Sequence, residues 1–374
     1  MDFLDIVKAT FYKAGANIEL TEEAIKITNL LKNKNKTVFI LIDGMGALLI
    51  KNLIPNSFLS NSIKEVVTTI FPSTTSVVLT SLATGQYPAE HSMNGWFNYI
   101  EETNESIVGL PFVNRFNPNE SVKTKFSDVF WGESLFDKVD SSVSVITKTD
   151  ISKSDYSKWF RGESKVYTYR TLKGAFQTLS KIITRNNEKE FIYLYIDDFD
   201  SLCHKCGPDS EEAKKLLEKI NERVEKFARI YAHKVNAIIT ADHGQVPIKN
   251  ENFFVINNED EMIELLKAPP SGDSRFVCFH VKEDRKKDFE QLFNERYEEH
   301  ARLISQEELD KSHLLGPEEM TEKAKSRYGD YCAIFNKGYA FSYQVGQINR
   351  KKLNKGCHSG DTDEEMKIPL IVIN

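Results

Sequence analysis

The feature that most limits what this chain can fold into is a series of short apolar runs separated by helical patterns. The runs are rich in β-branched residues and are expected to form buried strands at 36–43, 65–70, 191–196, 235–240 and 368–373. Apolar residues at helical spacing predict helices over 74–84, with Ser73 as the N-cap, and from Ser210 to about residue 230. This alternation predicts an α/β fold with a central, mostly parallel sheet flanked by helices.

Acidic and histidine side chains lie at or just beyond the ends of these strands. Active sites of open α/β sheets lie beyond the carboxyl ends of the strands. A charge in such a place is expensive to desolvate unless a partner compensates it. The candidate site residues at these ends and in adjoining loops are Asp43, Thr75, Asp200, His204, Asp242, His243 and His358.

The types of these candidates favour a metal site. Three aspartates and three histidines can supply three protein ligands to each of two metal ions, and three ligands with an open position are typical of catalytic sites. Oxygen and imidazole ligands favour Zn²⁺, with Mn²⁺ as the alternative. Two such ions would stabilise the attacking and leaving oxygens of a displacement at phosphorus. Thr75, near the first turn of its helix, is then the expected nucleophile, because a metal can activate its weakly nucleophilic hydroxyl.

The chain changes character between residues 250 and 329. A Pro-Pro-Ser-Gly loop is followed by an expected strand at 274–281, a charged amphipathic helix at 283–297 and a further expected strand at 301–305. Few residues of catalytic type occur in this stretch. It is therefore expected to be a smaller inserted α+β cap, with 1–249 and 330–374 as the core.

Composition excludes some classes of protein. A net charge of −6 argues against a nucleic-acid binder that works through bulk positive charge. No apolar run is long enough to cross a bilayer, and no secretory signal is expected. Five cysteines, an odd number, are typical of reduced thiols, so a cytoplasmic location is expected. Nothing in the sequence indicates an oligomeric state.

Five segments in order resemble the alkaline phosphatase superfamily, and within it the nucleotide pyrophosphatase/phosphodiesterase branch. They are LIDGMG, FPSTTSVVLTSLATGQYPAEHSMNGW, DDFDSLCHKCGP, TADHGQ and CHSG…EEMKIPLIV. The resemblance reaches from about residue 36 to the C-terminus and leaves only the insertion uncovered. It implies the alkaline-phosphatase-like fold with a cap. It also implies one metal ion held by Asp43, Asp242, His243 and Thr75, and another held by Asp200, His204 and His358.

The chain departs from the family pattern in a few places. Cys203 stands where relatives often have glycine before the metal-binding histidine, and Cys203 and Cys206 are interpreted as bystander thiols. Relatives of the nucleotide branch place an asparagine after the YP..H segment to bind a phosphoryl oxygen, and Asn94 is the candidate here. Alkaline phosphatases proper have a serine nucleophile with an arginine nearby. No such arginine is found near Thr75, which favours a diester over a monoester.

The sequence therefore predicts a two-metal hydrolase that cleaves phosphodiester or pyrophosphate bonds of nucleotide-type small molecules through a phospho-threonine intermediate. A phosphomonoesterase or a phosphonate-ester hydrolase of the same superfamily is the alternative within the enzyme class. A catalytically inactive binding or regulatory protein on this scaffold is the alternative of another class. No nucleic-acid surface and no membrane partner are expected.

Overall fold

The computed structural model describes all residues, 1–374, and has a central seven-stranded sheet as expected. Its strand order is β2-β18-β9-β1-β8-β6-β7, and every strand runs parallel to its neighbours except β18, which is antiparallel to β9 and β2. The strands are β1 (Lys36–Ile42), β2 (Ile63–Thr68), β6 (Ser142–Lys148), β7 (Lys165–Tyr169), β8 (Glu190–Ile196), β9 (Val235–Thr240) and β18 (Lys367–Ile373).

Three strands at the centre of the sheet are buried along their whole length. They are β1, β8 and β9, and their apolar, β-branched sequences are what burial on both faces of a parallel sheet requires. The sequence predicts these strands and β18 closely, but it does not predict β6 or β7. The strand β6 alternates serine with valine and isoleucine, and β7 carries polar and partly exposed residues.

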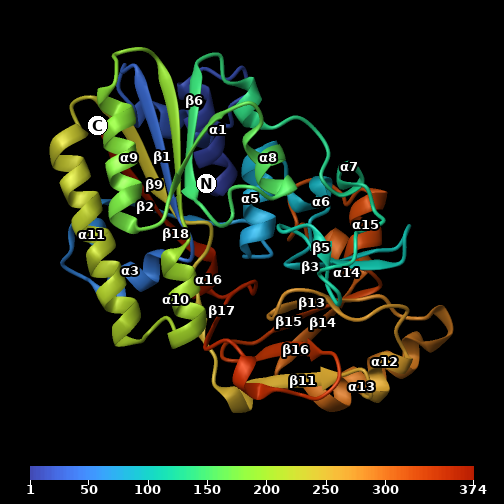
Figure 1. The fold of residues 1–374 in the computed structure, drawn as a ribbon. Helices are drawn as coiled ribbons and strands as arrows, with labels where there is room; N and C mark the ends of the chain where they lie inside the picture. Colours follow the sequence, from blue (N-terminus) through green and yellow to red (C-terminus); the bar gives the residue numbers. More distant parts are fainter.

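Helices cover both faces of this sheet (Figure 1). The helices α9 and α11 lie on one side of it, and α1 and α5 lie on the other. Ser210 caps α11 as predicted, whereas Thr74, rather than Ser73, is the N-cap of α5. The helices are α1 (Phe3–Ala14), α2 (Glu22–Leu30), α3 (Ala47–Leu53), α4 (Phe58–Ser62), α5 (Thr75–Thr84), α6 (Pro88–His91), α7 (Phe126–Val129), α8 (Asp155–Arg161), α9 (Leu172–Thr184), α10 (Asp198–Cys206), α11 (Glu211–Tyr231), α12 (Glu261–Glu264), α13 (Lys286–Tyr297), α14 (Gln306–Lys311), α15 (Glu322–Tyr328) and α16 (Asp363–Met366).

A second seven-stranded sheet lies at the end of the molecule opposite the termini (Figure 1). Its order is β14-β15-β13-β12-β3-β4-β5. Its strands are β3 (Phe97–Ile100), β4 (Glu105–Val108), β5 (Val113–Asn114), β12 (Ser271–Gly272), β13 (Phe276–Phe279), β14 (Ala301–Ser305) and β15 (Tyr331–Phe335). Two short two-stranded sheets pair β11 (Phe253–Asn257) with β16 (Ala340–Gln344) and β10 (Val246–Pro247) with β17 (Gly356–Cys357).

This second sheet extends beyond the predicted insertion. Residues 250–329 supply β12, β13 and β14, but β3, β4 and β5 join the sheet from the N-terminal half of the chain, and β15 begins just past residue 329. The β3–β5 strands are two to four residues long, so they leave little pattern in the sequence. The division into a core and a cap stays a prediction, and the boundaries at 250 and 329 do not coincide with those of the sheet.

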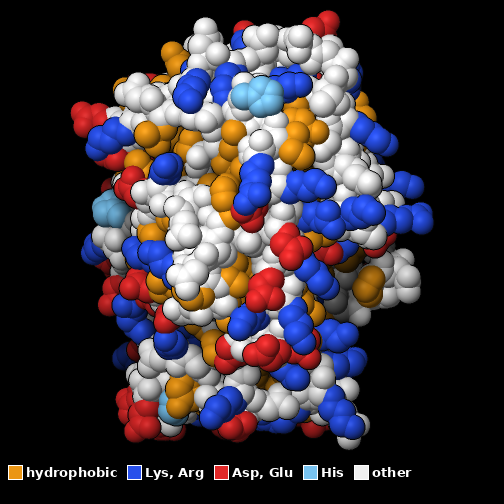
Figure 2. Space-filling model, turned by 90° about the vertical axis from the view of Figure 1, so that its left-hand side faces the viewer, with side chains coloured by type: hydrophobic (Ala, Val, Ile, Leu, Met, Phe, Trp, Pro, Cys, Tyr) orange, Lys and Arg blue, Asp and Glu red, His pale blue; other side chains and the backbone are white.

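The surface of the molecule carries charges of both signs. Figure 2 shows acidic and basic side chains interspersed over the face that includes the side of α9 and α11, with hydrophobic atoms in small scattered groups. Among the helices, none combines the length and the apolar character that crossing a bilayer requires.

Candidate active site

The carboxyl ends of β1, β8 and β9 bring the candidate residues together. The three strands are adjacent and parallel, so the segments that follow them meet at one edge of the sheet. Asp43 follows β1, Asp242 and His243 follow β9, and the segment after β8 carries Asp200 and His204. His358 reaches the same edge because β17 pairs with β10, which lies just beyond His243.

The segment after β8 is a helix, whereas the sequence places Asp200 and His204 simply at the end of a strand. The helix α10 begins at Asp198, directly after β8, and ends before Gly207. Asp200 and His204 are four residues apart on it and therefore share one face. None of the five cysteines forms a disulfide. Cys203 is buried, and neither Cys203 nor Cys206 belongs to a cluster of candidate ligands.

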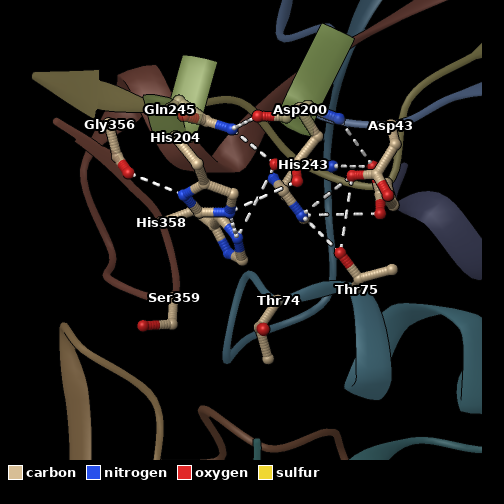
Figure 3. A network of polar contacts seen from close by, with 12 residues as sticks. Asp43, Thr74, Thr75, Asp200, His204, His243, Gln245, Gly356, His358 and Ser359 are labelled. Carbon is tan, nitrogen blue, oxygen red and sulfur yellow. Dashed lines mark hydrogen bonds and ion pairs between the residues drawn. The ribbon is translucent and has the colours of Figure 1, made fainter. Parts of the chain in front are cut away.

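The candidates form two clusters, each with ligand atoms within 4.8 Å of one another. We call Asp43, Asp242 and His243 the buried cluster and Asp200, His204 and His358 the accessible cluster. Figure 3 shows both, with Thr75 beside the buried one. The Thr75 hydroxyl lies 3.1 Å from His243 Nε2 and 3.4 Å from Asp43 Oδ1. Thr75 is the first residue of α5, so it stands at the positive end of a ten-residue helix.

All three histidines present the same nitrogen to the site. Nδ1 of His243 lies 2.9 Å from the Gly244 carbonyl, that of His204 2.7 Å from the Gly356 carbonyl and that of His358 3.0 Å from the Ser73 carbonyl. A carbonyl can only accept, so each Nδ1 carries the proton and each Nε2 offers a lone pair. Metal-ligating histidines are held in this way, because a hydrogen bond from the outer nitrogen fixes the tautomer and the ring orientation.

Lone pairs converge in the buried cluster without enough protons to satisfy them. His243 Nε2 lies 3.5 Å from Asp43 Oδ1 and 3.4 Å from Asp242 Oδ2, and Asp242 Oδ2 is buried with no hydrogen-bond donor. Burial raises the pKa of Asp43, and the neighbouring Asp242 and Asp200 carboxylates raise this pKa further. A cation between these atoms would satisfy them all, so the residues present fit a metal ion.

The accessible cluster is arranged in a similar way. His204 Nε2 lies 3.2 Å from His358 Nε2 and 3.2 Å from Asp200 Oδ2. Although burial lowers the pKa of His204, the Asp200 carboxylate outweighs it and raises this pKa to about 9. Burial and the neighbouring His243 lower the pKa of His358 to about 4. Without an ion, a second proton on His204 therefore lies at Nε2, between the Asp200 carboxylate and His358 Nε2. A divalent cation would take the place of this proton, so this cluster also fits a metal ion.

The two clusters are in direct contact. The rings of His243 and His358 stack with centroids 3.8 Å apart and planes inclined by 19°. Gly44, which follows Asp43, adopts a left-handed φ of +71°, and a Cβ there would come within 3.2 Å of the Asp200 backbone. A glycine at this position therefore lets α10 approach the end of β1 and brings Asp200 next to Asp43.

Two further side chains hold the carboxylates, and no motif in the sequence predicts them. The Tyr195 hydroxyl donates to Asp43 Oδ2, and the Gln245 amide donates to Asp200 Oδ1. Tyr195 is the penultimate residue of β8, and its register partner is Leu41, two residues before Asp43. Gln245 follows the Asp242-His243-Gly244 motif directly. Its place in that motif is the one signal that the sequence offers for it.

The loop that carries His358 is fixed by a buried ion pair. Arg275 and Glu365 are both fully buried, with Nε to Oε1 at 2.6 Å and Nη2 to Oε2 at 3.0 Å. Glu365 Oε1 also accepts the backbone N–H of Gly360, and the Arg275 N–H donates to Ser359 Oγ. Because Arg275 lies between β12 and β13, this pair connects the second sheet to the residues beside His358.

The structure does not bring Asn94 to the site. Its side chain is fully buried, its amide donates to the Arg327 carbonyl at 2.6 Å and to Ser271 Oγ at 3.4 Å, and it lines neither cleft at Thr75. Asp197 and Asp198 are paired with Lys148 and stay outside both clusters. Nearness to a motif in sequence did not determine which way Asn94 points.

Two clefts meet at Thr75 and Asp200. The first, of about 510 Å³, runs from the accessible cluster to side chains of the second sheet and to Lys352. The second, of about 350 Å³, borders Asp43 and apolar residues such as Leu110 and Tyr156. Arg115 lines the first cleft, although it is distant from Thr75 in sequence. The sequence gives no sign that Arg115 reaches this cleft, because only arginines close to Thr75 along the chain can be recognised there.

A threonine at a helix start, beside one of two adjoining ligand clusters at the carboxyl edge of this sheet, defines a class: a hydrolase with the alkaline phosphatase fold. The family model described as type I phosphodiesterase / nucleotide pyrophosphatase matches residues 37–361. The chain belongs to this family, whose members are metallo-hydrolases of the phosphodiesterase and pyrophosphatase type.

Solved structures share the fold at low sequence identity. Murine ectonucleotide pyrophosphatase/phosphodiesterase 5 is 17% identical, with a TM-score of 0.65 over 90% of this chain and 87% of that one. An inactive threonine-to-alanine variant of that protein, in complex with AMP, is 17% identical, with a TM-score of 0.64 over 91% of this chain and 87% of that one. Phosphonoacetate hydrolase from Sinorhizobium meliloti 1021, in complex with phosphonoacetate, is 16% identical, with a TM-score of 0.61 over 91% of this chain and 90% of that one. A comparison with curated protein sequences finds no match.

Proposed function

We propose that the chain hydrolyses phosphodiester or pyrophosphate bonds of nucleotide-type small molecules with two divalent metal ions. The observation that carries the proposal is the place of the Thr75 hydroxyl, 3.1 Å from His243 Nε2 and 3.4 Å from Asp43 Oδ1. Two clefts meet there, which suits a phosphorus centre with an organic group on each side.

The two clusters would hold the two ions. Asp43, Asp242 and His243, with Thr75, would hold one, and Asp200, His204 and His358 would hold the other. Zn²⁺ suits these ligands, with Mn²⁺ as the alternative. A pair of such ions supplies Lewis-acid stabilisation of negative charge on the attacking and leaving oxygens of a displacement at phosphorus.

Thr75 is the proposed nucleophile. Its Oγ loses its proton to water and forms a bond to phosphorus while the bond to the leaving oxygen breaks. The leaving oxygen takes the electron pair and can take up a proton from water. Water then hydrolyses the phosphoester on Thr75 and restores the hydroxyl. The N-terminus of α5 places positive partial charge beside the phosphoryl oxygens. Tyr195 and Gln245 hold Asp43 and Asp200 in place during both steps.

Known proteins of the same fold support this proposal. The murine relative was solved with AMP in an inactive threonine-to-alanine variant. The bacterial neighbour bound to phosphonoacetate is a reason to keep the phosphonate hydrolase as the second candidate. The alternative of an inactive binding protein is less favoured, because all seven predicted side chains converge and a protein without chemistry would not need both clusters.

The test is hydrolysis of bis(p-nitrophenyl) phosphate against p-nitrophenyl phosphate, with Zn²⁺ or Mn²⁺ added, for the wild type, Thr75→Ala and Thr75→Ser. The diester is expected to be cleaved faster, and Thr75→Ala is expected to lose at least about a thousandfold in kcat. Thr75→Ser keeps a hydroxyl and is expected to retain part of the activity. A preference for the monoester would replace the substrate class, and full activity in Thr75→Ala would refute the proposed nucleophile.

A further inference from the structure

Arg115 occupies an unusual place on the wall of the larger cleft. The residue lies just past β5 in the second sheet, and its guanidinium carbon sits 3.8 Å from the centre of the Phe97 ring. The rings of Phe116 and Tyr343 lie 5.3 Å and 5.5 Å from the same carbon. Three aromatic rings therefore hold the guanidinium plane beside the cleft.

This arginine has no acidic partner. Its one side-chain hydrogen bond runs from Nη1 to the Pro270 carbonyl, and it forms no ion pair. Burial lowers the pKa of Arg115 to about 10, which still leaves the group charged at neutral pH. A half-buried cation usually finds a carboxylate. Here most of its N–H groups have no protein acceptor.

The other charged groups of this cleft do not neutralise Arg115. Asp273 is occupied, since Oδ2 accepts from the Thr74 hydroxyl and Oδ1 from the Ser274 N–H. Asp200 is engaged by His204 and Gln245. Lys352 lines the same cleft without an ion pair. The wall of the larger cleft thus presents two cations that lack counterions.

The position of the cleft indicates which part of a substrate reaches Arg115. The larger cleft starts at Asp200, His204 and His358, whereas Asp43 borders the smaller one. Thr75 lies against the buried cluster, so in an in-line displacement the leaving group departs on the side away from it, which is that of the accessible cluster. No hydrogen bond or ion pair joins Arg115 to a residue of either cluster.

We propose that Arg115, with Lys352 on the same cleft, binds a second anionic group, a phosphate or a carboxylate, carried by the leaving group of the substrate. This inference rests on the proposed function, because it assigns the leaving-group side of that site. The preferred substrates are then esters or anhydrides whose leaving group is itself an anion, such as the pyrophosphate released from a nucleoside triphosphate.

Matched substrate pairs test the inference. Methyl 4-nitrophenyl phosphate and methyl 3-carboxy-4-nitrophenyl phosphate share the transferred group and differ by one carboxylate on the leaving group. Adenosine 5′-(4-nitrophenyl) phosphate and ATP both transfer adenylate and differ in the charge of the leaving group. In Arg115→Gln, kcat/KM for the member with the anionic leaving group is expected to fall about ten- to a hundredfold, while the neutral partner stays within about twofold.

The control is Arg302→Gln, an exposed arginine of β14 that pairs with Asp361 and lines neither cleft. It is expected to change none of the four rates. A loss confined to the carboxylated aryl ester or to ATP would support the inference and identify carboxylate or phosphate as the group bound. Equal losses within each pair would overturn it. It would also be overturned if Arg115→Gln selectively slowed 4-nitrophenyl phosphate, because Arg115 would then contact the transferred phosphoryl group.

If none of the substrates is hydrolysed, the proposed function fails. A binding measurement at equilibrium still tests the role of Arg115 in that case. By calorimetric titration of the metal-loaded protein, the carboxylated product 5-hydroxy-2-nitrobenzoate is expected to bind at least about tenfold more weakly to Arg115→Gln than to the wild type. Its affinity for Arg115→Lys is expected to lie between these two. An affinity that is unchanged in Arg115→Gln would overturn the inference.

Discussion

The buried and accessible clusters offer the same kinds of ligand from different parts of the fold. Asp43, Asp242 and His243 follow two central strands, and their side chains are at most 4% exposed. Asp200, His204 and His358 come from a helix and a loop, and the His204 side chain is 25% exposed. The first cluster is fixed by the central sheet, whereas the His358 loop of the second cluster is also held by the Arg275–Glu365 pair from the second sheet.

This difference separates two tasks. The buried cluster faces Thr75, where a fixed geometry favours attack on phosphorus. The accessible cluster opens into the larger cleft, where the second sheet can adapt the site to different leaving groups. The reacting end of the site is thus built on the central sheet, and substrate preference is built on its surroundings.

The largest expected effect comes from removing either cluster. Asp242→Ala and His204→Ala are each expected to reduce diester hydrolysis on the order of 10⁴-fold, because one Lewis acid is lost in each case. Steady-state rates at two equivalents of Zn²⁺ per chain measure this. Excess Zn²⁺ is expected to rescue His204→Ala in part and Asp242→Ala hardly at all. Equal rescue of both variants would break the distinction between the two clusters.

The second effect concerns the ion pair that holds the His358 loop. Glu365→Ala leaves Arg275 buried without its partner and is expected to lower the free energy of unfolding by about 3–5 kcal/mol, measured by urea denaturation. The neighbouring Glu364 pairs with Lys337 at the surface, so Glu364→Ala is expected to cost less than about 1 kcal/mol. If both variants cost the same, the buried pair does not anchor the loop.

Two tyrosines of β8 give a smaller effect on catalysis. Tyr195→Phe removes the hydroxyl that donates to Asp43 and is expected to lower kcat about tenfold. Tyr193, two residues earlier, has a buried hydroxyl without a partner, so Tyr193→Phe is expected to leave kcat unchanged and to keep or raise stability. Comparison of kcat and melting temperature for the two variants separates positioning of Asp43 from packing.

The smallest expected effect is a pH dependence of the free energy of unfolding, caused by His91, a core histidine outside both clusters. His91 accepts the Met93 N–H at Nδ1 and contacts Ser81 Oγ through Nε2, and burial lowers its pKa to about 3. The unfolded chain, with a histidine pKa near 6.5, binds the proton first. Stability is therefore expected to fall as the pH drops from about 6.5 towards 3, by about 1.4 kcal/mol per pH unit at most.

The control for this pH dependence is His91→Asn, which keeps an acceptor for the Met93 N–H but does not titrate. Its free energy of unfolding is expected to be lower than that of the wild type at pH 7.5 and to change less between pH 7.5 and 5.5, by about 1 kcal/mol. Urea denaturation at the two pH values measures the difference. Identical changes in both proteins would exclude His91 as the titrating group.

The sequence was most informative where burial leaves a continuous pattern. The central strands β1, β8 and β9 read as apolar runs, and Asp43, Asp242 and His243 follow them directly. It failed for the α10 helix, because three aspartates close to a Gly-Pro pair favour a loop. Arg115 and Arg275 were not identified, since strands of two to five residues bring them to the site by pairing between distant segments.

The central claim is that the two clusters are two separate metal sites that act together at Thr75. The direct measurement is the number of zinc ions per chain after equilibrium dialysis, by inductively coupled plasma mass spectrometry, for the wild type, His243→Ala and His358→Ala. The account predicts two ions in the wild type and one in each variant. A wild type that holds one ion or none, or a variant that keeps both, would contradict it.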